Sequence, residues 1–360
     1  MRGELTINLQ SLRKNYRALN ALSSENCKTA AVVKANAYGI GVEYVAPALY
    51  TEGARKFFVA TLDEGVQLRG ILSDDVTIFI LNGFWAAERE TYHEHNLIPV
   101  LNSYNEIDAY LEFAIETSAK LPANIHFDIG MNRLGVPSEE YEAVYTMDLS
   151  GLDILYVMGH LSSSEELDNP HNEIQRKRFE EIAAHFPYAK KCLSNSGGVF
   201  LGDDYHHDLT RPGICLYGGC ASKKMVELIS PVVSLHAPIL QIHDGEEGEF
   251  TGYNETYRIS KKTKLGIIPI GYADGIFRSL GNAGSLYCSG HELPICGRVS
   301  MDLVICDLKA IPEDEFPKVG DMIEVIGDHQ TLDKLATDAG TISYEILTNL
   351  GRRYTRSVIK

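Results

Sequence analysis

The first two thirds of the chain alternate short apolar segments with longer helical ones, and this alternation constrains the fold more than any other feature. Strand-like runs stand at 30–34, 57–60, 76–81, 97–101, 124–130, 153–160, 191–195 and 208–214. Helical segments lie among them, at 43–51, 63–71, 103–119, 138–147 and 171–186. Eight strands alternating with helices favour an α/β fold of the (β/α)₈ barrel type. An open, doubly wound sheet is the competing arrangement.

Near residue 225 the pattern changes to short strands separated by Gly, Asn and Pro turns. Such runs stand at 232–235, 265–270, 304–308 and 322–326, and helical stretches follow at 331–339 and after Ser343. This pattern predicts a second, mostly β domain over residues 226–360, behind a barrel domain over residues 1–225. Residues 4–9 also look like a strand, so residues 1–9 could pair with the C-terminal domain.

Composition excludes several classes of protein. The 33 basic and 49 acidic residues give a net charge of −16, which argues against non-specific binding of nucleic acid or an anionic membrane. The seven cysteines form no C-x-x-C pair and match no zinc-site spacing, so no metal is expected. No apolar run approaches the length of a membrane span, and the N-terminus lacks the apolar region of a signal peptide. We expect a cytoplasmic protein.

A lysine follows the first barrel strand, in the sequence Ala-Val-Val-Lys-Ala-Asn-Ala-Tyr-Gly at 31–39. At the carboxyl end of a buried strand, the amine of Lys34 is partly desolvated and can lose its proton. A neutral amine is a nucleophile that forms Schiff bases with aldehydes, including pyridoxal 5'-phosphate (PLP). For a lone lysine, the commoner explanation is a strand-end side chain whose charged tip stays in water.

Further polar and glycine residues follow the later strands, and in a barrel the carboxyl ends of all strands meet at one rim. They are Arg133, His160, Asn195, Ser196, Arg211, Gly213 and Ile214. The segments after strands seven and eight, Ser-Gly-Gly at 196–198 and Gly-Ile at 213–214, suit a phosphate because glycine lets the backbone approach an anion closely. A Schiff-base lysine beside a phosphate site indicates PLP.

Eight ordered motifs in this sequence resemble those of the PLP-dependent alanine racemase family, over essentially the whole chain. They are AVVKANAYG around Lys34, GMNRLG around Arg133, SNSGG at 194–198, RPGICLYG at 211–218, GYNETY at 252–257, IPIGYADG at 268–275, GRVSMDL at 297–303 and TISYEILTNLGRR at 341–353. The resemblance implies a PLP-binding barrel followed by a β domain, in agreement with the pattern of strands and helices.

The resemblance also implies a role for each matching residue. Lys34 would bind PLP and act as one of two catalytic bases, and Tyr253 would be the opposite base, supplied across the interface of a head-to-tail homodimer. Arg133 and the partner's Met301 would bind the substrate carboxylate. The residues around the cofactor would be Lys34, Tyr38, His160, Asn195, Ser196, Arg211, Gly213, Ile214 and Tyr344.

The implied activity is interconversion of L-alanine and D-alanine, which supplies D-alanine for peptidoglycan. Racemisation needs acid–base groups on both faces of the α-carbon, which is why two bases are expected. Three alternatives stay open: a broader racemase acting on serine or lysine, a non-catalytic PLP-binding protein on the same barrel, and a decarboxylase on a related barrel. Non-catalytic proteins of this kind usually lack the second domain.

The chain departs from the family pattern at His126. Some family members carry a lysine at this position, modified to a carbamate, which orients the substrate-binding arginine. A histidine cannot form that carbamate, so Arg133 needs another partner: an anion, a water molecule or a nearby side chain.

Overall fold

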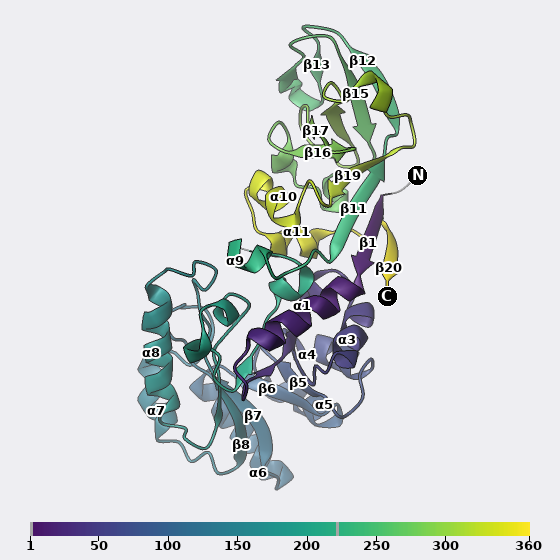
Figure 1. Ribbon diagram of the computed structural model, residues 1–360. Helices are drawn as coiled ribbons and strands as arrows, with labels where there is room; N and C mark the ends of the chain where they lie inside the picture. The colour runs from purple at the N-terminus through teal and green to yellow at the C-terminus, as the bar shows by residue number, and fades with distance from the viewer. Residues whose placement is uncertain (1–2, 221–222) are drawn as a thin grey trace.

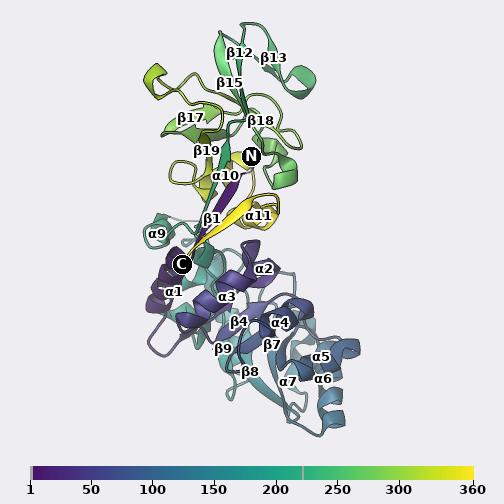
Figure 2. The same ribbon diagram turned by 90° about the vertical axis from the view of Figure 1, so that its right-hand side faces the viewer.

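The computed structural model describes residues 3–220 and 223–360. Its elements form two parts that follow one another along the long axis of the molecule (Figure 1). The barrel part contains α1 to α9 and the strands between them, and the C-terminal part contains β1 and the elements from β11 to β20. The C-terminus lies near the junction of the two parts (Figure 2).

The barrel part is built from parallel strands with helices outside them. Its elements are α1 (Leu9–Leu22), β2 (Lys28–Thr29), β3 (Ala31–Val32), α2 (Lys34–Tyr38), α3 (Val42–Thr51), β4 (Lys56–Val59), α4 (Leu62–Arg69), β5 (Thr77–Ile80), α5 (Arg89–Glu94), β6 (Leu97–Leu101), α6 (Tyr104–Thr117), β7 (Leu121–His126), α7 (Tyr141–Tyr145), β8 (Leu152–Met158), α8 (His171–Ala183), β9 (Lys190–Cys192), β10 (Leu209–Thr210) and α9 (Lys223–Val226). Strands β3 to β9 form one sheet in sequence order, and every neighbouring pair is parallel. Strands β3 to β6 are buried on both faces almost throughout, which explains their continuous apolar runs in the sequence.

The short strand β10 closes this sheet into a barrel. It pairs in parallel with β2, which leads directly into β3. Ala30 N donates to Thr210 O at 2.8 Å, and Arg211 N donates to Ser194 O at 2.9 Å on the other side. The eight-stranded barrel is therefore confirmed and the open sheet is wrong. The eighth strand is shorter than the predicted 208–214, because Pro212 has no N–H to donate and the chain then turns into a 3₁₀ helix at Ile214–Tyr217.

The C-terminal part is mostly β, as predicted. Its elements are β1 (Glu4–Asn8), β11 (Val233–Pro238), β12 (Gln241–Gly245), β13 (Phe250–Thr251), β14 (Tyr257–Arg258), β15 (Thr263–Ile268), β16 (Ser285–Cys288), β17 (His291–Pro294), β18 (Val304–Asp307), β19 (Met322–Ile326), α10 (Leu332–Ala339), α11 (Ser343–Asn349) and β20 (Thr355–Ile359). The largest sheet has the order β17-β16-β19-β11-β1-β20. Strand β1 lies between β11 and β20, so the first strand of the chain belongs to the C-terminal part.

Two barrel helices begin at capping residues that the sequence places directly after strands. The Thr61 hydroxyl accepts a hydrogen bond from Glu64 N, and the Glu64 carboxylate accepts one from Thr61 N in return. The Ser103 hydroxyl accepts a hydrogen bond from Glu106 N at the start of α6. These caps fix where each helix leaves the carboxyl rim of the barrel.

Alternate residues of a barrel strand face the helices and the barrel interior. The Phe127 ring lies 5.5 Å from the Tyr141 ring and 6.2 Å from the Tyr145 ring, both on α7, so Phe127 faces the helices. His126, one residue earlier, therefore faces the barrel interior at the end of β7.

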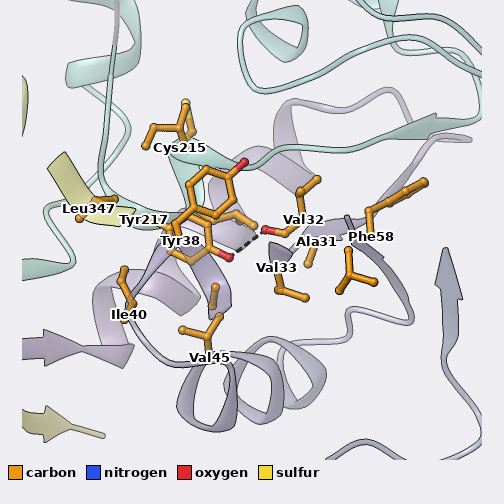
Figure 3. Packing of buried hydrophobic residues seen from close by; sticks show 14 of the residues in the cluster. Ala31, Val32, Val33, Tyr38, Ile40, Val45, Phe58, Cys215, Tyr217 and Leu347 are labelled. Carbon is orange, nitrogen blue, oxygen red and sulfur yellow. Dashed lines mark hydrogen bonds between the residues drawn. The ribbon is translucent and has the colours of Figure 1, made fainter. Parts of the chain in front are cut away.

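The C-terminal part also holds the segment that follows β3. Arg356 of β20 donates to Gly39 O at 3.0 Å and to Ile40 O at 2.9 Å. Gly39 has φ +80°, and a Cβ at this position would lie 2.5 Å from Leu347 O of α11. Only glycine combines this backbone conformation with so close an approach. Figure 3 shows Leu347 and Ile40 beside the buried Tyr38.

Candidate functional site

Lys34 lies at the carboxyl rim of the barrel, where α2 begins after β3 and Val33, as predicted. Burial lowers the pKa of its amine, and the charges of Arg133 and Arg211 lower it further, while Glu64 opposes them. Across residues 3–220 and 223–360, its Nζ has no hydrogen-bond or ion-pair partner. The Lys34 amine is therefore easier to deprotonate than a solvated lysine, and it is not engaged by the protein.

The turn after Lys34 has a conformation that the sequence does not predict. Residues 35–38 have φ of 52°, 54°, 53° and 56°, in the left-handed region, although none of them is glycine. Each such residue costs about 1–2 kcal/mol. Hydrogen bonds hold the turn: Gly39 N donates to Ala35 O at 2.8 Å, and Ala35 N donates to the Glu64 carboxylate at 2.6 Å. Backbone strain of this kind persists where a functional site requires it.

Tyr38 is packed between two other tyrosines. Its ring stacks on Tyr217 at 4.6 Å, and the Tyr217 hydroxyl donates to Val32 O at 2.8 Å (Figure 3). The Tyr344 ring lies 6.0 Å from Tyr38, and its hydroxyl donates to the Glu165 carboxylate at 2.6 Å. Burial raises the pKa of Tyr38 and of Tyr344, so both hydroxyls keep their protons and can donate hydrogen bonds.

Two backbone amides converge on the hydroxyl of Ser196. Ser196 Oγ accepts hydrogen bonds from Gly213 N at 2.8 Å and from Cys215 N at 3.4 Å. A Cβ on Gly213 would lie 2.1 Å from the Tyr38 hydroxyl, so that hydroxyl packs directly against the Gly213 backbone. A serine hydroxyl and backbone amides are groups that bind anions in proteins, and we call Ser196, Gly213 and Cys215 the Ser196–Gly213 cluster.

The two other predicted residues of this region are buried or engaged by the protein. Ile214 is buried next to Gly213. The Asn195 side chain accepts hydrogen bonds from the Ser164 hydroxyl at 2.6 Å and from Gly198 N at 3.1 Å. Asn195 therefore holds the segment that carries Ser196, and its place in cofactor binding stays a prediction.

Arg211 is buried and has one nitrogen without a partner. One terminal nitrogen donates to His160 Nδ1 at 2.9 Å, and the other donates to the carbonyl oxygens of Gly159 and Leu193. Burial and the charges of Arg211 and Arg133 hold the pKa of His160 well below its usual range, so its Nδ1 is a neutral acceptor. Among the described residues, the buried Nε of Arg211 has no hydrogen-bond partner. Such a donor fits an acceptor atom on a bound ligand.

Arg133 follows β7 with its guanidinium exposed and, in the described part of the chain, without a hydrogen bond or ion pair. The positive charge of Arg133 lowers the pKa of Lys34, His126 and His160. His126 Nδ1 lies 2.9 Å from Asn102 Oδ1. Burial and the charge of Arg211 lower the pKa of His126 to about 3.

The structure does not bring Tyr253 and Met301 to this rim. Both lie on the surface of the C-terminal part, where Tyr253 is 67 % exposed and Met301 is 53 % exposed. Tyr253 follows β13, which lies at the end of the molecule away from the barrel (Figures 1 and 2). A single chain therefore contains the Lys34 half of the predicted site but leaves the Tyr253 half separate from it.

Sequence reasoning missed three residues of the rim: Glu64, Asn102 and Tyr217. Asn102 directly follows β6, so the strand-end rule that found Arg133 could have found it. Glu64 is part of a capping box and was recognisable only as a helix start. Tyr217 stands inside the RPGICLYG motif at 211–218, but the residues of that motif do not show that its ring stacks on Tyr38.

Within residues 3–220 and 223–360, no group of three or more His, Cys, Asp or Glu side chains is placed to hold a metal ion. In the same residues, no helix combines the length and apolar character that a membrane crossing requires.

Comparison with known proteins agrees with this geometry. The family profile of the alanine racemase N-terminal domain matches residues 7–221, and that of the alanine racemase C-terminal domain matches residues 232–358. A catabolic alanine racemase of Agrobacterium fabrum is 44 % identical over 99 % of this chain and 92 % of its own length. An alanine racemase of Rickettsia conorii is 42 % identical over 98 % of both chains.

Solved structures show the same likeness in three dimensions. The crystal structure of alanine racemase from Bartonella henselae with covalently bound pyridoxal phosphate has a TM-score of 0.96 and 39 % identity, over 100 % of both chains. The biosynthetic alanine racemase of Pseudomonas aeruginosa has a TM-score of 0.91 and 29 % identity, over 100 % of this chain and 99 % of its own. Two matching domains and full-length relatives place this chain in the alanine racemase family.

Proposed function

We propose that this protein is a PLP-dependent alanine racemase that interconverts L-alanine and D-alanine. The observation that carries the proposal is the desolvated, unengaged amine of Lys34 at the rim of the barrel, the rim that also carries the Ser196–Gly213 cluster. The Bartonella relative, 39 % identical, carries covalently bound pyridoxal phosphate.

The residues of the rim fit PLP at three points. The Lys34 amine suits the aldehyde. Ser196 Oγ and the amides of Gly213 and Cys215 suit the phosphate. The buried Nε of Arg211, which lacks a partner among the described residues, suits the pyridine nitrogen. Because a guanidinium keeps its proton, Arg211 would donate a hydrogen bond to that nitrogen without protonating it.

Bound PLP supplies an electron sink that acidifies the α-carbon of an attached amino acid. Lys34 Nζ would exchange a proton with one face of that carbon, since burial and two neighbouring arginines favour its neutral form. The hydroxyl of Tyr253 of the partner subunit would serve the opposite face. The positive charges of Arg133 and Arg211 favour a phenolate in this position. The exposure of Tyr253 in the single chain supports a homodimer that shares its active sites.

For the substrate carboxylate, we assign Arg133 of the barrel and Met301 of the partner subunit. The Arg133 guanidinium has no acceptor in residues 3–220 and 223–360, so its donors are free for a carboxylate. Comparing kcat/KM for alanine, serine and lysine tests the substrate. Faster turnover of serine or lysine than of alanine would replace the proposed activity with that of a broader racemase.

We assign the enzyme to the cytoplasm, where it would supply D-alanine for peptidoglycan. A deletion strain that grows only with added D-alanine would support this role. The Agrobacterium relative is named as catabolic. A strain that needs no D-alanine but no longer consumes it would therefore assign the chain to the catabolic role.

The activity itself is tested with Lys34→Ala. The variant should lose covalent PLP, measured by borohydride reduction and mapping of the labelled peptide, and should lose more than about 10³-fold in racemisation rate. Lys56→Ala is the matched control, because Lys56 is another half-buried lysine whose pKa is lowered by burial, at the opposite end of a barrel strand.

The Lys56 variant should keep its PLP and its activity. Label on a lysine other than Lys34 would refute the assigned attachment site. A wild-type protein that binds PLP without racemising any amino acid would be a non-catalytic PLP-binding protein, and release of carbon dioxide would identify a decarboxylase.

A further inference from the structure

Glu64 links the turn after Lys34 to the start of the neighbouring helix α4. Its Oε1 accepts a hydrogen bond from Ala35 N at 2.6 Å, and its Oε2 accepts hydrogen bonds from Ala60 N at 2.8 Å and from Thr61 N at 3.3 Å. In an ordinary capping box, the carboxylate reaches back only to the N–H at the start of its own helix. Glu64 also reaches the residue that directly follows Lys34, so one side chain bonds the segments that follow two barrel strands, β3 and β4.

The turn after Lys34 needs a contact of this kind. Residues 35–38 lie in the left-handed region, which is unfavourable for residues other than glycine. The bond from Gly39 N to Ala35 O closes the turn on itself. The bond from Ala35 N to the Glu64 carboxylate fastens the turn to the next part of the barrel, and hydrogen bonds to an ionised group are stronger than those between neutral groups.

A carboxylate at position 64 serves both segments at once, because each of its two oxygens accepts hydrogen bonds. An amide has one accepting oxygen and one donating nitrogen. A glutamine at this position could therefore bond either Ala35 N or Ala60 N, and its NH₂ group would face the N–H of the other. The negative charge of Glu64 also raises the pKa of Lys34, against the effect of burial. Glu64 therefore acts on Lys34 through the backbone and through its charge.

Glu106 makes the same kind of contact at another part of the rim. It lies three residues after the capping residue Ser103 of α6, and its carboxylate accepts hydrogen bonds from Asn102 N at 3.0 Å and from Phe84 N at 3.3 Å. Phe84 follows β5 and Asn102 follows β6, so Glu106 also joins the segments after two strands. Phe84 does not adjoin a residue that is proposed to bind PLP or substrate. Glu106 therefore allows support of the fold to be separated from an effect on Lys34.

We propose that Glu64 is a positioning residue for Lys34. By holding Ala35 in the left-handed turn, the Glu64 carboxylate fixes the backbone that carries the Lys34 side chain and so sets the direction from which Nζ meets the α-carbon of the substrate. The carboxylate takes no proton from the substrate. The inference rests on the proposed function, because it takes Lys34 as the base on one face of that carbon.

Steady-state kinetics compare Glu64→Gln with the matched variant Glu106→Gln. In Glu64→Gln, kcat for alanine should fall about 10- to 100-fold while KM changes less than about 3-fold, since displacing a reacting group by about 1 Å has an effect of this size. Glu64→Ala, which removes the contact without placing a donor there, should behave in the same way. Glu106→Gln should keep kcat within about 3-fold of wild type. Equal kcat values in folded Glu64→Gln and Glu106→Gln would overturn the proposal.

The two directions of racemisation show which face of the α-carbon is affected. Lys34 is proposed to serve one face and Tyr253 the other, so a displaced Lys34 slows proton removal from one enantiomer only. The α-deuterium isotope effect on kcat should therefore rise in Glu64→Gln for one enantiomer of alanine and not for the other. A loss of folded protein would lower both rates without changing either isotope effect. Isotope effects that rise equally, or that do not rise at all, would contradict the positioning role.

Hydrogen exchange of the PLP-bound protein, read by mass spectrometry, does not depend on turnover. A peptide that covers residues 35–39 should exchange at least about 10-fold faster in Glu64→Gln than in wild type, and a peptide that covers Phe84 should be unchanged. Glu106→Gln should give the opposite pattern. Unchanged exchange at 35–39 refutes the inference even in a protein that racemises alanine. The expected pattern supports the positioning of Lys34 by Glu64 even if no racemisation is found.

Discussion

Lys34 and Tyr253, the two proposed bases, lie in very different surroundings. Lys34 is half buried at the barrel rim, where Arg133, Arg211 and Glu64 act on its charge. Tyr253 is 67 % exposed on the C-terminal part. In both cases the residues that follow have left-handed backbone without glycine: residues 35–38 after Lys34 and residues 254–255 after Tyr253. One half of the proposed site lies within a single chain, and the other half would be presented to a second chain.

The two parts of the chain therefore place their proposed catalytic groups differently, one by burial and the other by exposure. In the barrel, burial lowers the pKa of the Lys34 amine. Burial also encloses the Nε of Arg211, which has no hydrogen-bond partner among the described residues. The C-terminal part can present a tyrosine on a rigid β framework without burying it. The second copy would then provide the burial that the single chain lacks.

Tyr253→Phe gives the largest expected effect on this comparison. Removing the hydroxyl should lower the racemisation rate about 10²- to 10⁴-fold, the range of a general acid–base group, while PLP stays bound. Rate and cofactor absorbance are measured on the same sample. Tyr188→Phe, at another exposed tyrosine on the barrel side, should behave as wild type. Unchanged racemisation by Tyr253→Phe would refute the two-base assignment.

Mixing the two inactive variants tests whether the halves come from different chains. In a mixed dimer of Lys34→Ala and Tyr253→Phe, one site has both native residues and the other has neither. Random assembly after co-expression should therefore restore about a quarter of the wild-type activity. No recovery, with mixed dimers present by mass spectrometry, would mean that each chain uses its own Lys34 and Tyr253.

Gly213→Ala should disrupt the barrel half at the Ser196–Gly213 cluster, the proposed phosphate site. The new Cβ would lie 2.1 Å from the Tyr38 hydroxyl, and Tyr38 cannot move away because its ring stacks on Tyr217. We expect PLP to bind roughly 100-fold more weakly, because the overpacking would cost about 3 kcal/mol. The affinity is measured by titrating PLP into cofactor-free protein. Gly70→Ala is the control, because the nearest atom to its Cβ is at an ordinary 3.4 Å. Equal PLP affinity in the two variants would show that Gly213 does not lie at the phosphate site.

The barrel rim could be predicted from the sequence to a useful degree. A lysine, an arginine and a histidine each stand at the end of an apolar run, and barrel topology brings such ends together, so Lys34, Arg133 and His160 could be placed on one rim. Tyr253 could not be found in this way. It is one of 19 tyrosines, and only the family motif around it assigned a role.

Two features of the rim were beyond sequence reasoning for a physical reason. The left-handed turn at 35–38 contains two alanines, which have no local preference for that conformation, so tertiary contacts from Glu64 and Arg356 impose it. The Asn102–His126 bond joins the ends of two different strands, and its existence depends on a register that apolar runs do not specify.

The buried histidine of the barrel rim, His126, should make the free energy of unfolding depend on pH. The ordinary pKa of histidine is 6.5, and that of His126 is about 3 in the fold. The unfolded chain therefore takes up this proton near pH 6.5 while the folded chain does not, so the stability is full above pH 6.5 and falls as the pH drops toward 3. Between pH 7 and pH 5, wild type should lose about 2 kcal/mol more than His126→Gln.

Urea unfolding at several pH values, followed by circular dichroism, measures this difference. His185→Gln serves as the control and should keep the wild-type profile, because its ring is exposed and its loss changes no buried group. Identical pH profiles for wild type and His126→Gln would mean that the His126 ring is solvated. The barrel rim would then be accessible to water, as the surface around Tyr253 is.

The smallest expected effect compares the two strained backbones directly. Ala35→Gly and Glu255→Gly each replace an exposed left-handed residue by one that adopts this conformation freely. The relief of about 1–2 kcal/mol exceeds the added entropy of glycine, about 0.5–1 kcal/mol, so both variants should gain about 0.5–1 kcal/mol. This corresponds to a rise of roughly 1–2 °C in Tm, at fixed protein and PLP concentrations.

Ala109→Gly in the middle of α6 provides the opposite control, because a regular helix loses about 0.5–1 kcal/mol to glycine. If Ala35→Gly lowers Tm as Ala109→Gly does, the turn after Lys34 is not left-handed in solution. If Ala35→Gly raises Tm and also lowers kcat, the strained turn is retained because it positions Lys34. The same pair of measurements on Glu255→Gly would show whether the loop after Tyr253 uses its strain in the same way, although the Tyr253 hydroxyl is proposed to serve a neighbouring chain.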